Sequence, residues 1–114
     1  MKILVIVNGP AYGSDETFNA LRLATALAQR DDVQPRVFLM GDAVCRRRPE
    51  NPGRLLHARP HAEDVRPPWG QLACCGTCLD ARGLTKDHLI DEPTRSSMDE
   101  LAAWVVESEK VLTF

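Results

Sequence analysis

The chain has 114 residues, of which 44% are hydrophobic and 26% charged, and its formal net charge at pH 7 is −2. This length corresponds to one domain and this composition to an ordinary globular chain, which argues against a multidomain enzyme, a fibrous repeat or a disordered tail. The near-neutral charge gives no general reason to expect binding to nucleic acid or to an anionic membrane surface.

The first predicted element is a buried strand over residues 3–7, a continuous run of β-branched residues and Leu. This run is far shorter than the ~20 apolar residues that cross a bilayer. No h-region or cleavage site precedes it, so we expect a cytoplasmic protein without a signal peptide. A turn-rich loop follows, and residues 17–28 then carry apolar side chains at helical spacing after a cap at Ser14 or Asp15.

The rest of the chain is predicted to contain three more strands and two helices. The strands are expected at residues 36–40, 71–75 and 110–114. A turn starts at Gly76, and Gly83 is placed to end the short helix that follows it. Residues 94–97 are expected to form a loop and cap, with Ser97 and Glu100 as the capping box of the second helix.

The predicted order of elements indicates one α/β domain over residues 1–114, a three-layer sandwich with a mostly parallel sheet. The last helix is expected to bury one face against that sheet. Its predicted buried residues are Leu101, Ala102, Trp104 and Val105.

Residues 45–70 do not fit this pattern, because they hold five Pro and six Arg without a period of 2 or 3.6. A structureless insert of this length inside a compact domain counts against its own assignment. One interpretation is a solvated basic loop, and a second is a lid or an RNA-contacting loop. A third is that the segment is the translation of a shifted reading frame in a GC-rich gene, and that it replaces a helix encoded in the correct frame.

The third interpretation is the one we favour. Back-translation with permitted codons and a shift of one nucleotide gives, as one allowed result, TPGGYYTLDRMLKTFARRGG. This string has a turn followed by an amphipathic helix, and it supplies the helix that the predicted order lacks. Resequencing of the coding DNA tests the idea, and a single unambiguous frame together with a folded protein carrying the printed residues contradicts it.

The second cluster of unusual composition is Cys74, Cys75 and Cys78. Cys75 and Cys78 make one C-x-x-C, which cannot close a tetrahedral zinc site alone, and most other soft ligands lie in the anomalous segment. We therefore expect no metal and no cofactor. At the carboxyl end of a strand in a cytosolic βα unit, such thiols are typically redox-active or nucleophilic.

A thiol at a strand-to-helix turn lies near a helix N-terminus, where the positive end of the dipole favours the thiolate. Arg82 is close in sequence and is expected to add to this effect. We therefore predict Cys75 as the nucleophile, leave Cys78 as either a second reactive thiol or a packing residue, and read Cys74 as a small buried hydrophobe.

The loop at residues 8–14 is the second candidate, since loops after parallel strands line the crevice at the carboxyl edge of the sheet. It matches neither of the common phosphate-binding patterns. Asn8, Gly9 and Tyr12 are expected to share a site with the cysteine loop, although Tyr12 is as readily explained as a packing aromatic.

The remaining crevice residues are expected around the cysteine turn. They are Gly76, Thr77, Asp80 and Gly83. Asp80 and Arg82 are interpreted as a local ion pair that fixes a turn, and Asp42 as a turn residue.

Taken together, NGPAYGSDETFNALRLATALA, VFLMGDAV, CGTCLDARGL and SSMDELAAWVVESEKVLTF resemble the DsrE/DsrF/TusD-like sulfur-relay family, in particular its small YchN-type members. The resemblance covers residues 2–44 and 71–114. In that family the middle region is a helix, in agreement with the shifted reading frame.

This resemblance implies a flavodoxin-like α/β sandwich that assembles into a homo-oligomer, either a trimer or a hexamer. It also implies a persulfide on a cysteine after the third strand, in the pattern Cys-x₆-Arg-Gly. That pattern maps onto Cys75, Arg82 and Gly83, and the second cysteine of the family maps onto Cys78.

Two function classes follow. The first is a sulfur carrier or sulfurtransferase-like protein, in which Cys75 accepts sulfur from a donor protein and passes it to an acceptor protein. The second is a non-catalytic oligomeric binding or regulatory module with redox-sensing cysteines, and a dithiol oxidoreductase is a weaker third. A hydrolase is poorly supported, because no Ser, His and Asp of the sequence stand in a context typical of a catalytic triad. We expect neither a nucleic acid nor a membrane as partner.

Overall fold

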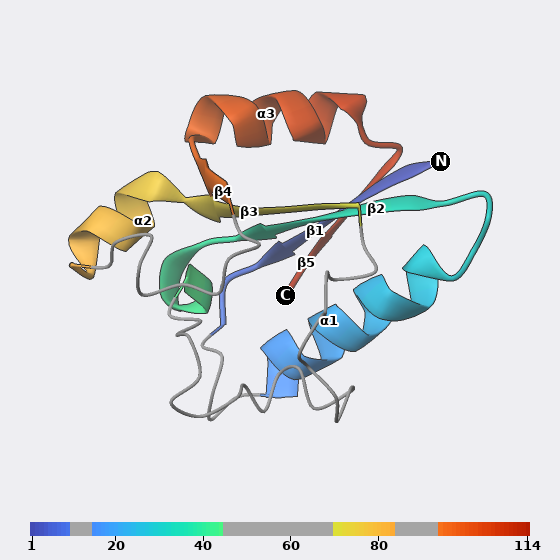
Figure 1. Ribbon diagram of the computed structural model, residues 1–114, viewed down its shortest axis with the longest axis horizontal. Helices are drawn as coiled ribbons and strands as arrows, with labels where there is room; N and C mark the ends of the chain where they lie inside the picture. The colour runs from blue at the N-terminus through green and yellow to red at the C-terminus, as the bar shows by residue number, and fades with distance from the viewer. Residues whose placement is uncertain (10–14, 45–69, 84–93) are drawn as a thin grey trace.

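The computed structural model describes residues 1–9, 15–44, 70–83 and 94–114 (Figure 1). The elements in chain order are β1 (Lys2–Val7), α1 (Asp15–Ala28), β2 (Gln34–Leu39), the 3₁₀ helix η1 (Gly41–Val44), β3 (Gln71–Cys75), α2 (Gly76–Ala81), β4 (Thr94–Ser96), α3 (Met98–Glu107) and β5 (Lys110–Thr113). Apart from Gly70, the anomalous segment lies outside the described residues, so its three interpretations stay predictions.

The five strands form one sheet in the order β4-β3-β2-β1-β5, and every pairing between them is parallel. Helix α1 covers one face of the sheet and α3 covers the other (Figure 1). The predicted three-layer α/β architecture is thereby confirmed. It explains why the β1 sequence is apolar at almost every position, since both faces of a central parallel strand are covered.

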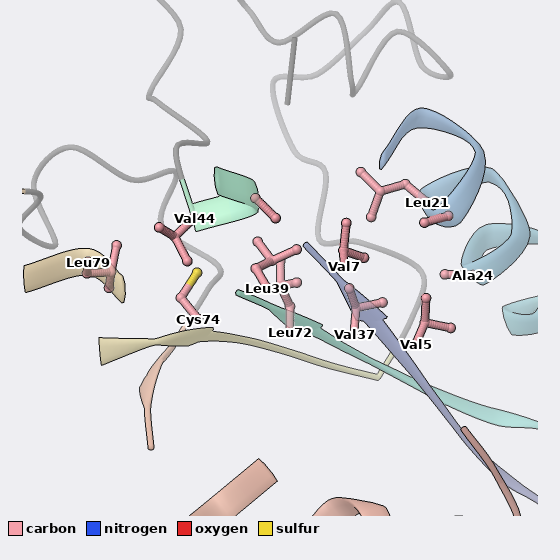
Figure 2. Close-up of a cluster of buried hydrophobic side chains, with 12 residues drawn as sticks. Val5, Val7, Leu21, Ala24, Val37, Leu39, Val44, Leu72, Cys74 and Leu79 are labelled. Carbon is pink, nitrogen blue, oxygen red and sulfur yellow. The ribbon is translucent and has the colours of Figure 1, made fainter. Parts of the chain in front are cut away.

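The sheet separates two clusters of buried side chains. The cluster on the α1 side is drawn in Figure 2 and includes Cys74 and Leu79 at the end nearest α2. The cluster on the α3 side contains Leu4, Phe38, Ala73, Cys75, Leu101 and Trp104. Because successive side chains of a strand point to opposite faces, the adjacent cysteines Cys74 and Cys75 belong to different clusters.

Trp104 anchors α3 to the sheet. Its ring meets Phe38 edge-on, with centroids 5.9 Å apart and planes at 88°. The guanidinium of Arg36 lies 5.2 Å from the Trp104 centroid and forms an ion pair with Glu107, at 2.7 Å. Such edge-to-face and cation–π contacts add to the free energy gained by burying the ring.

Two expectations about the C-terminal half are wrong. Residues 94–96, expected as a loop, form the edge strand β4, because they pair in parallel with the end of β3. Residues 94–96 are three polar residues, too few and too polar to show the alternating pattern by which a strand is predicted. On α3, Leu101 and Trp104 are buried as predicted, whereas Ala102 and Val105 are exposed.

The predicted helix boundaries are largely confirmed. The Ser97 hydroxyl accepts a hydrogen bond from the Glu100 N–H at 3.3 Å, which is the cap expected for α3. Helix α2 begins directly at Gly76, where a turn was expected, and the chain leaves it at Gly83 with φ +62°. Within the described ranges, no helix has both the length and the apolarity needed to cross a bilayer.

Candidate functional site

Cys75 lies at the junction of β3 and α2, where it is the N-cap residue of the helix. Gly76, Thr77 and Cys78 follow as the first turn of α2. The predicted placement of the C-x-x-C at the carboxyl end of the third strand is therefore found. The Cys75 side chain points to the α3 side of the sheet and its residue is only 3% exposed, whereas Cys78 is half-buried between the two core clusters.

The thiols of Cys75 and Cys78 are in contact, and both are free. Burial raises the pKa of Cys78 above its ordinary value, and the hydrogen bond from its S–H to the Cys75 sulfur raises it further. The Gly41 N–H and the charge of Arg82 lower the pKa but do not offset the burial. The net shift of the Cys78 pKa is upward, which favours its protonated thiol at neutral pH.

Gly41 connects the cysteine turn to the end of β1. Its N–H donates to the Cys78 sulfur, and its φ of +52° is in the left-handed region that favours glycine. A Cβ at Gly41 would lie 3.4 Å from the Asn8 carbonyl oxygen, so the two loops pack closely here. Asn8 and the cysteine turn thus approach each other through this glycine, which the sequence reasoning missed, and the shared site expected of them stays a prediction.

The other residues of the first loop have different surroundings. The Asn8 side-chain amide donates to the Phe114 backbone oxygen at 3.3 Å. The Gly9 carbonyl accepts from the buried Thr17 hydroxyl at 2.7 Å, so it anchors the start of α1. Tyr12 lies outside the described residues, and its expected role as a cap on the site stays a prediction.

The expected ion pair between Asp80 and Arg82 is not formed. Two residues apart on a helix, the side chains point to different sides and do not face each other. Arg82 instead bonds Asp42 at 2.9 Å and donates to the Cys78 carbonyl at 3.2 Å. Asp42, interpreted as a turn residue, therefore holds the arginine that acts on Cys78.

Asp80 pairs with Arg95 of β4 through two hydrogen bonds, at 2.9 and 2.7 Å. These bonds hold the pKa of Asp80 below its ordinary value. Arg95 was assigned to a loop by the sequence reasoning, which had no signal for a long-range partner. The pair ties the edge strand to the outer side of α2.

Gly76 is what allows β4 to approach this closely. A Cβ at Gly76 would lie 3.0 Å from the Cζ and Nε atoms of Arg95 and 3.0 Å from the Ser96 carbonyl oxygen. The Arg95 side chain therefore passes over the first turn of α2, beside Cys75. Thr77 is exposed on the same turn, and Gly83 ends the helix with its N–H bonded to the Asp80 carbonyl at 3.1 Å.

Over the residues that the structure describes, no group of three or more His, Cys, Asp or Glu side chains is placed to hold a metal ion. Cys45 and all three histidines of the chain lie outside those residues. What the described site offers is a pair of contacting thiols with an arginine on each side.

A family model described as DsrE/DsrF-like matches residues 1–114. The chain belongs to the DsrE/DsrF-like family. It is 38% identical over 115 residues to Protein YchN of Escherichia coli (strain K12), with 99% of this chain and 98% of that protein covered. It is also 32% identical over 116 residues to an uncharacterized protein of Methanocaldococcus jannaschii, with both chains covered completely.

The crystal structure of the ychN protein from E. coli superposes on this chain with a TM-score of 0.80 at 38% identity, covering 100% of this chain and 99% of that one. The fold expected from the sequence resemblance is thus that of a solved structure. Family membership carries with it a possible sulfur-relay role, and the residues that would perform it are taken up next.

Proposed function

We propose that this DsrE/DsrF-like protein is a sulfur carrier that holds a persulfide on Cys75 and passes the outer sulfur to a partner protein. The observation that carries the proposal is the position of Cys75 at the carboxyl end of β3, in contact with a second thiol, in a chain that matches the family over its whole length. The partners are a sulfur donor and a sulfur acceptor, and the compartment is the reducing cytoplasm.

The loading step is an attack of the Cys75 thiolate on the sulfane sulfur of a donor persulfide. A bond forms between Cys75 Sγ and that sulfur, and the donor thiolate leaves with the electron pair of the broken S–S bond. In the second step an acceptor thiolate attacks the outer sulfur and Cys75 leaves as thiolate. Neither step needs an external oxidant, since the sulfane sulfur moves at constant oxidation state.

Cys78 controls the lifetime of the persulfide in this scheme. Its thiolate would attack the inner sulfur, forming a Cys75–Cys78 disulfide and releasing hydrosulfide. Because burial raises the pKa of Cys78, little thiolate is present at neutral pH and this side reaction is slow. The same contact would form the disulfide under oxidation and so protect Cys75.

The alternative function is a non-catalytic binding or regulatory module whose cysteines sense redox state. The observation that favours it is the 3% exposure of Cys75, since sulfur transfer requires the first turn of α2 to open for a donor. On this alternative, the Cys75–Cys78 disulfide is the signal and no sulfur is carried.

We expect the reduced protein to gain the mass of one sulfur atom when it is incubated with inorganic polysulfide and measured by intact mass spectrometry. Cys75→Ser should lose the adduct completely, because it removes the nucleophile. The matched control Cys78→Ser should keep it for longer, because the resolving thiol is gone.

Absence of the adduct on the wild-type protein, or an equal adduct on Cys75→Ser, contradicts sulfur carriage by Cys75. If the wild-type protein then forms only a Cys75–Cys78 disulfide under mild oxidation, the redox-sensing function takes its place.

We also propose that the carrier is a homo-oligomer, a trimer or a hexamer. Helix α3 leaves Met98, Val105 and Val106 exposed, and the edge strand β5 leaves Val111 exposed. Met98 and Val105 lie next to the buried face of the helix, and Val106 extends the same side away from the sheet. Several large apolar side chains gathered on one side of a small domain are typical of an interaction surface.

Val106→Asp is expected to reduce the molar mass measured by size-exclusion chromatography with light scattering to that of a smaller assembly. Val106 is 86% exposed, so a charge there leaves the fold intact but disfavours burial in an interface. Leu23→Asp, on the opposite face of the sheet, is the control and should keep the wild-type mass. A wild-type mass of one chain contradicts the proposal.

A further inference from the structure

The Ser96 hydroxyl oxygen is fully buried and, among the described residues, has no hydrogen-bond partner. Buried hydroxyls in native proteins are almost always paired, because an unpaired one loses its bonds to water without compensation. An unpaired buried hydroxyl is therefore unusual, and the residues around Ser96 indicate a function for it.

Ser96 is the register partner of Cys75 in the parallel pairing of β3 and β4. Side chains of partnered residues on neighbouring strands point to the same face of the sheet and lie next to each other. The unpaired donor is thus the lateral neighbour of the thiol that is proposed to carry sulfur, on the α3 side of the sheet.

Arg95, the preceding residue of β4, is the register partner of Cys74, so its side chain starts on the α1 side of the sheet and reaches from there to the residue after Cys75. Its guanidinium lies over Gly76, the residue after Cys75, and Asp80 holds it there with two hydrogen bonds. The hydrogen bond and charge of Asp80 raise the pKa of Arg95, and the charge of Cys75 raises it as well. Asp80 thereby holds the Arg95 guanidinium in place, close enough to Cys75 to interact with a negative charge on its sulfur.

We propose that strand β4 completes the sulfur site: the Ser96 hydroxyl and the Arg95 guanidinium stabilise negative charge on the sulfur borne by Cys75. The inference rests on the proposed function, in that the anion it serves is first the Cys75 thiolate and then the outer sulfur of its persulfide. Arg95 and Ser96 are positioning residues that act through Cys75.

The chemistry of the two anions explains why both groups are needed. A hydroxyl donates one hydrogen bond to a sulfur anion, and a guanidinium adds a fixed positive charge. A persulfide is more acidic than its parent thiol, so its outer sulfur is an anion at neutral pH and accepts the bond that Ser96 lacks. The stabilised persulfide forms more readily and is lost more slowly.

The other charged and titratable groups of the site leave this assignment intact. Asp80 is neutralised by Arg95, and Arg82 is directed to Asp42 and to the Cys78 carbonyl. Cys78 is protonated, since burial raises its pKa. Within the described residues, Arg95 is therefore the cation assigned to Cys75 and Arg82 the one assigned to Cys78.

The test is site-resolved alkylation of Cys75 by iodoacetamide, followed by peptide mass spectrometry. Ser96→Ala and Arg95→Gln are each expected to slow the reaction at pH 7 by about threefold to tenfold, while the rate at pH 10 stays that of the wild-type protein. Arg95→Lys should recover part of the rate, because it restores the charge. Arg30→Gln, which removes an exposed arginine outside the site, is the matched control and should leave the alkylation rate of Cys75 unchanged.

If Ser96 had a purely structural role, Cys75 would become less reactive only when the fold is destabilised. The proposed role predicts lower reactivity without a loss of stability. Ser96→Ala removes a buried hydroxyl that has no partner among the described residues, so its free energy of unfolding should equal or exceed that of the wild-type protein. The reactivity of Cys75 should fall all the same. Polysulfide adducts on both variants should also decay severalfold faster.

Wild-type alkylation rates at pH 7 in both Ser96→Ala and Arg95→Gln overturn the inference, whether or not the protein takes up sulfur. Absence of a polysulfide adduct on the wild-type protein overturns the carrier function instead. In that case slowed alkylation in the two variants still supports the role of β4, because alkylation requires no persulfide.

Discussion

Phe38→Ala is expected to lower the free energy of unfolding by about 3–5 kcal/mol, a large part of the stability of a domain of this size. Phe38 is completely buried near the C-terminal end of β2 and packs edge-on against Trp104. Truncation removes the transfer free energy of the ring and leaves a cavity between the sheet and α3. The same cluster contains Cys75, so the cavity should also make that thiol easier to alkylate.

Urea unfolding followed by circular dichroism measures the loss. Gln29→Ala is the control, since Gln29 is exposed just after the end of α1 and its truncation should change the free energy of unfolding by less than about 0.5 kcal/mol. A loss below about 1 kcal/mol for Phe38→Ala would mean that α3 does not depend on this contact.

Gly76→Ala should destabilise the protein by about 1–3 kcal/mol, although alanine is the better helix former by up to about 1 kcal/mol. The added methyl group would lie 3.0 Å from the Ser96 carbonyl oxygen and from two atoms of Arg95. The side chain of Arg95 can swing away, but the backbone oxygen of a paired strand cannot move without loosening β4. The site next to Cys75 should therefore be disturbed together with the fold.

Gly70→Ala is the matched control at the other end of β3. A methyl group there would lie 3.9 Å from the Pro35 carbonyl oxygen, which is an ordinary contact. The two variants should differ in their urea midpoints and in the alkylation rate of Cys75. Equal urea midpoints would show that β4 can move away from Gly76 without a loss of stability. The ion pair of Asp80 and Arg95 would then hold β4 less firmly than its geometry indicates.

Much of the fold was predictable from local pattern. The run of β-branched residues in β1, the capping box of Ser97 and Glu100, and the glycine that ends α2 each report a structure that is decided within a few residues. Strand β4 was missed for the opposite reason. Three polar-rich residues become a strand only because β3 offers them an edge with which to pair.

The site divides in the same way. The sequence was enough to place Cys75 and Cys78 at a strand-to-helix turn, because their spacing and the preceding apolar run are local features. The partners of the charged residues were not predictable. Asp80 bonds Arg95 and Arg82 bonds Asp42 because distant segments meet at one edge of the sheet, whereas neighbours in sequence point apart on α2.

By itself, then, the sequence determined a small, nearly neutral α/β domain with a C-x-x-C pair of cysteines after the third strand. Only the tertiary structure decided that Cys75 is buried, that burial raises the pKa of Cys78, and that β4 pairs with β3 so that Ser96 lies beside Cys75. Burial and long-range pairing depend on which elements are packed together. The physical reason is that desolvation and charge act through space, over a few ångströms, between groups that lie far apart along the chain.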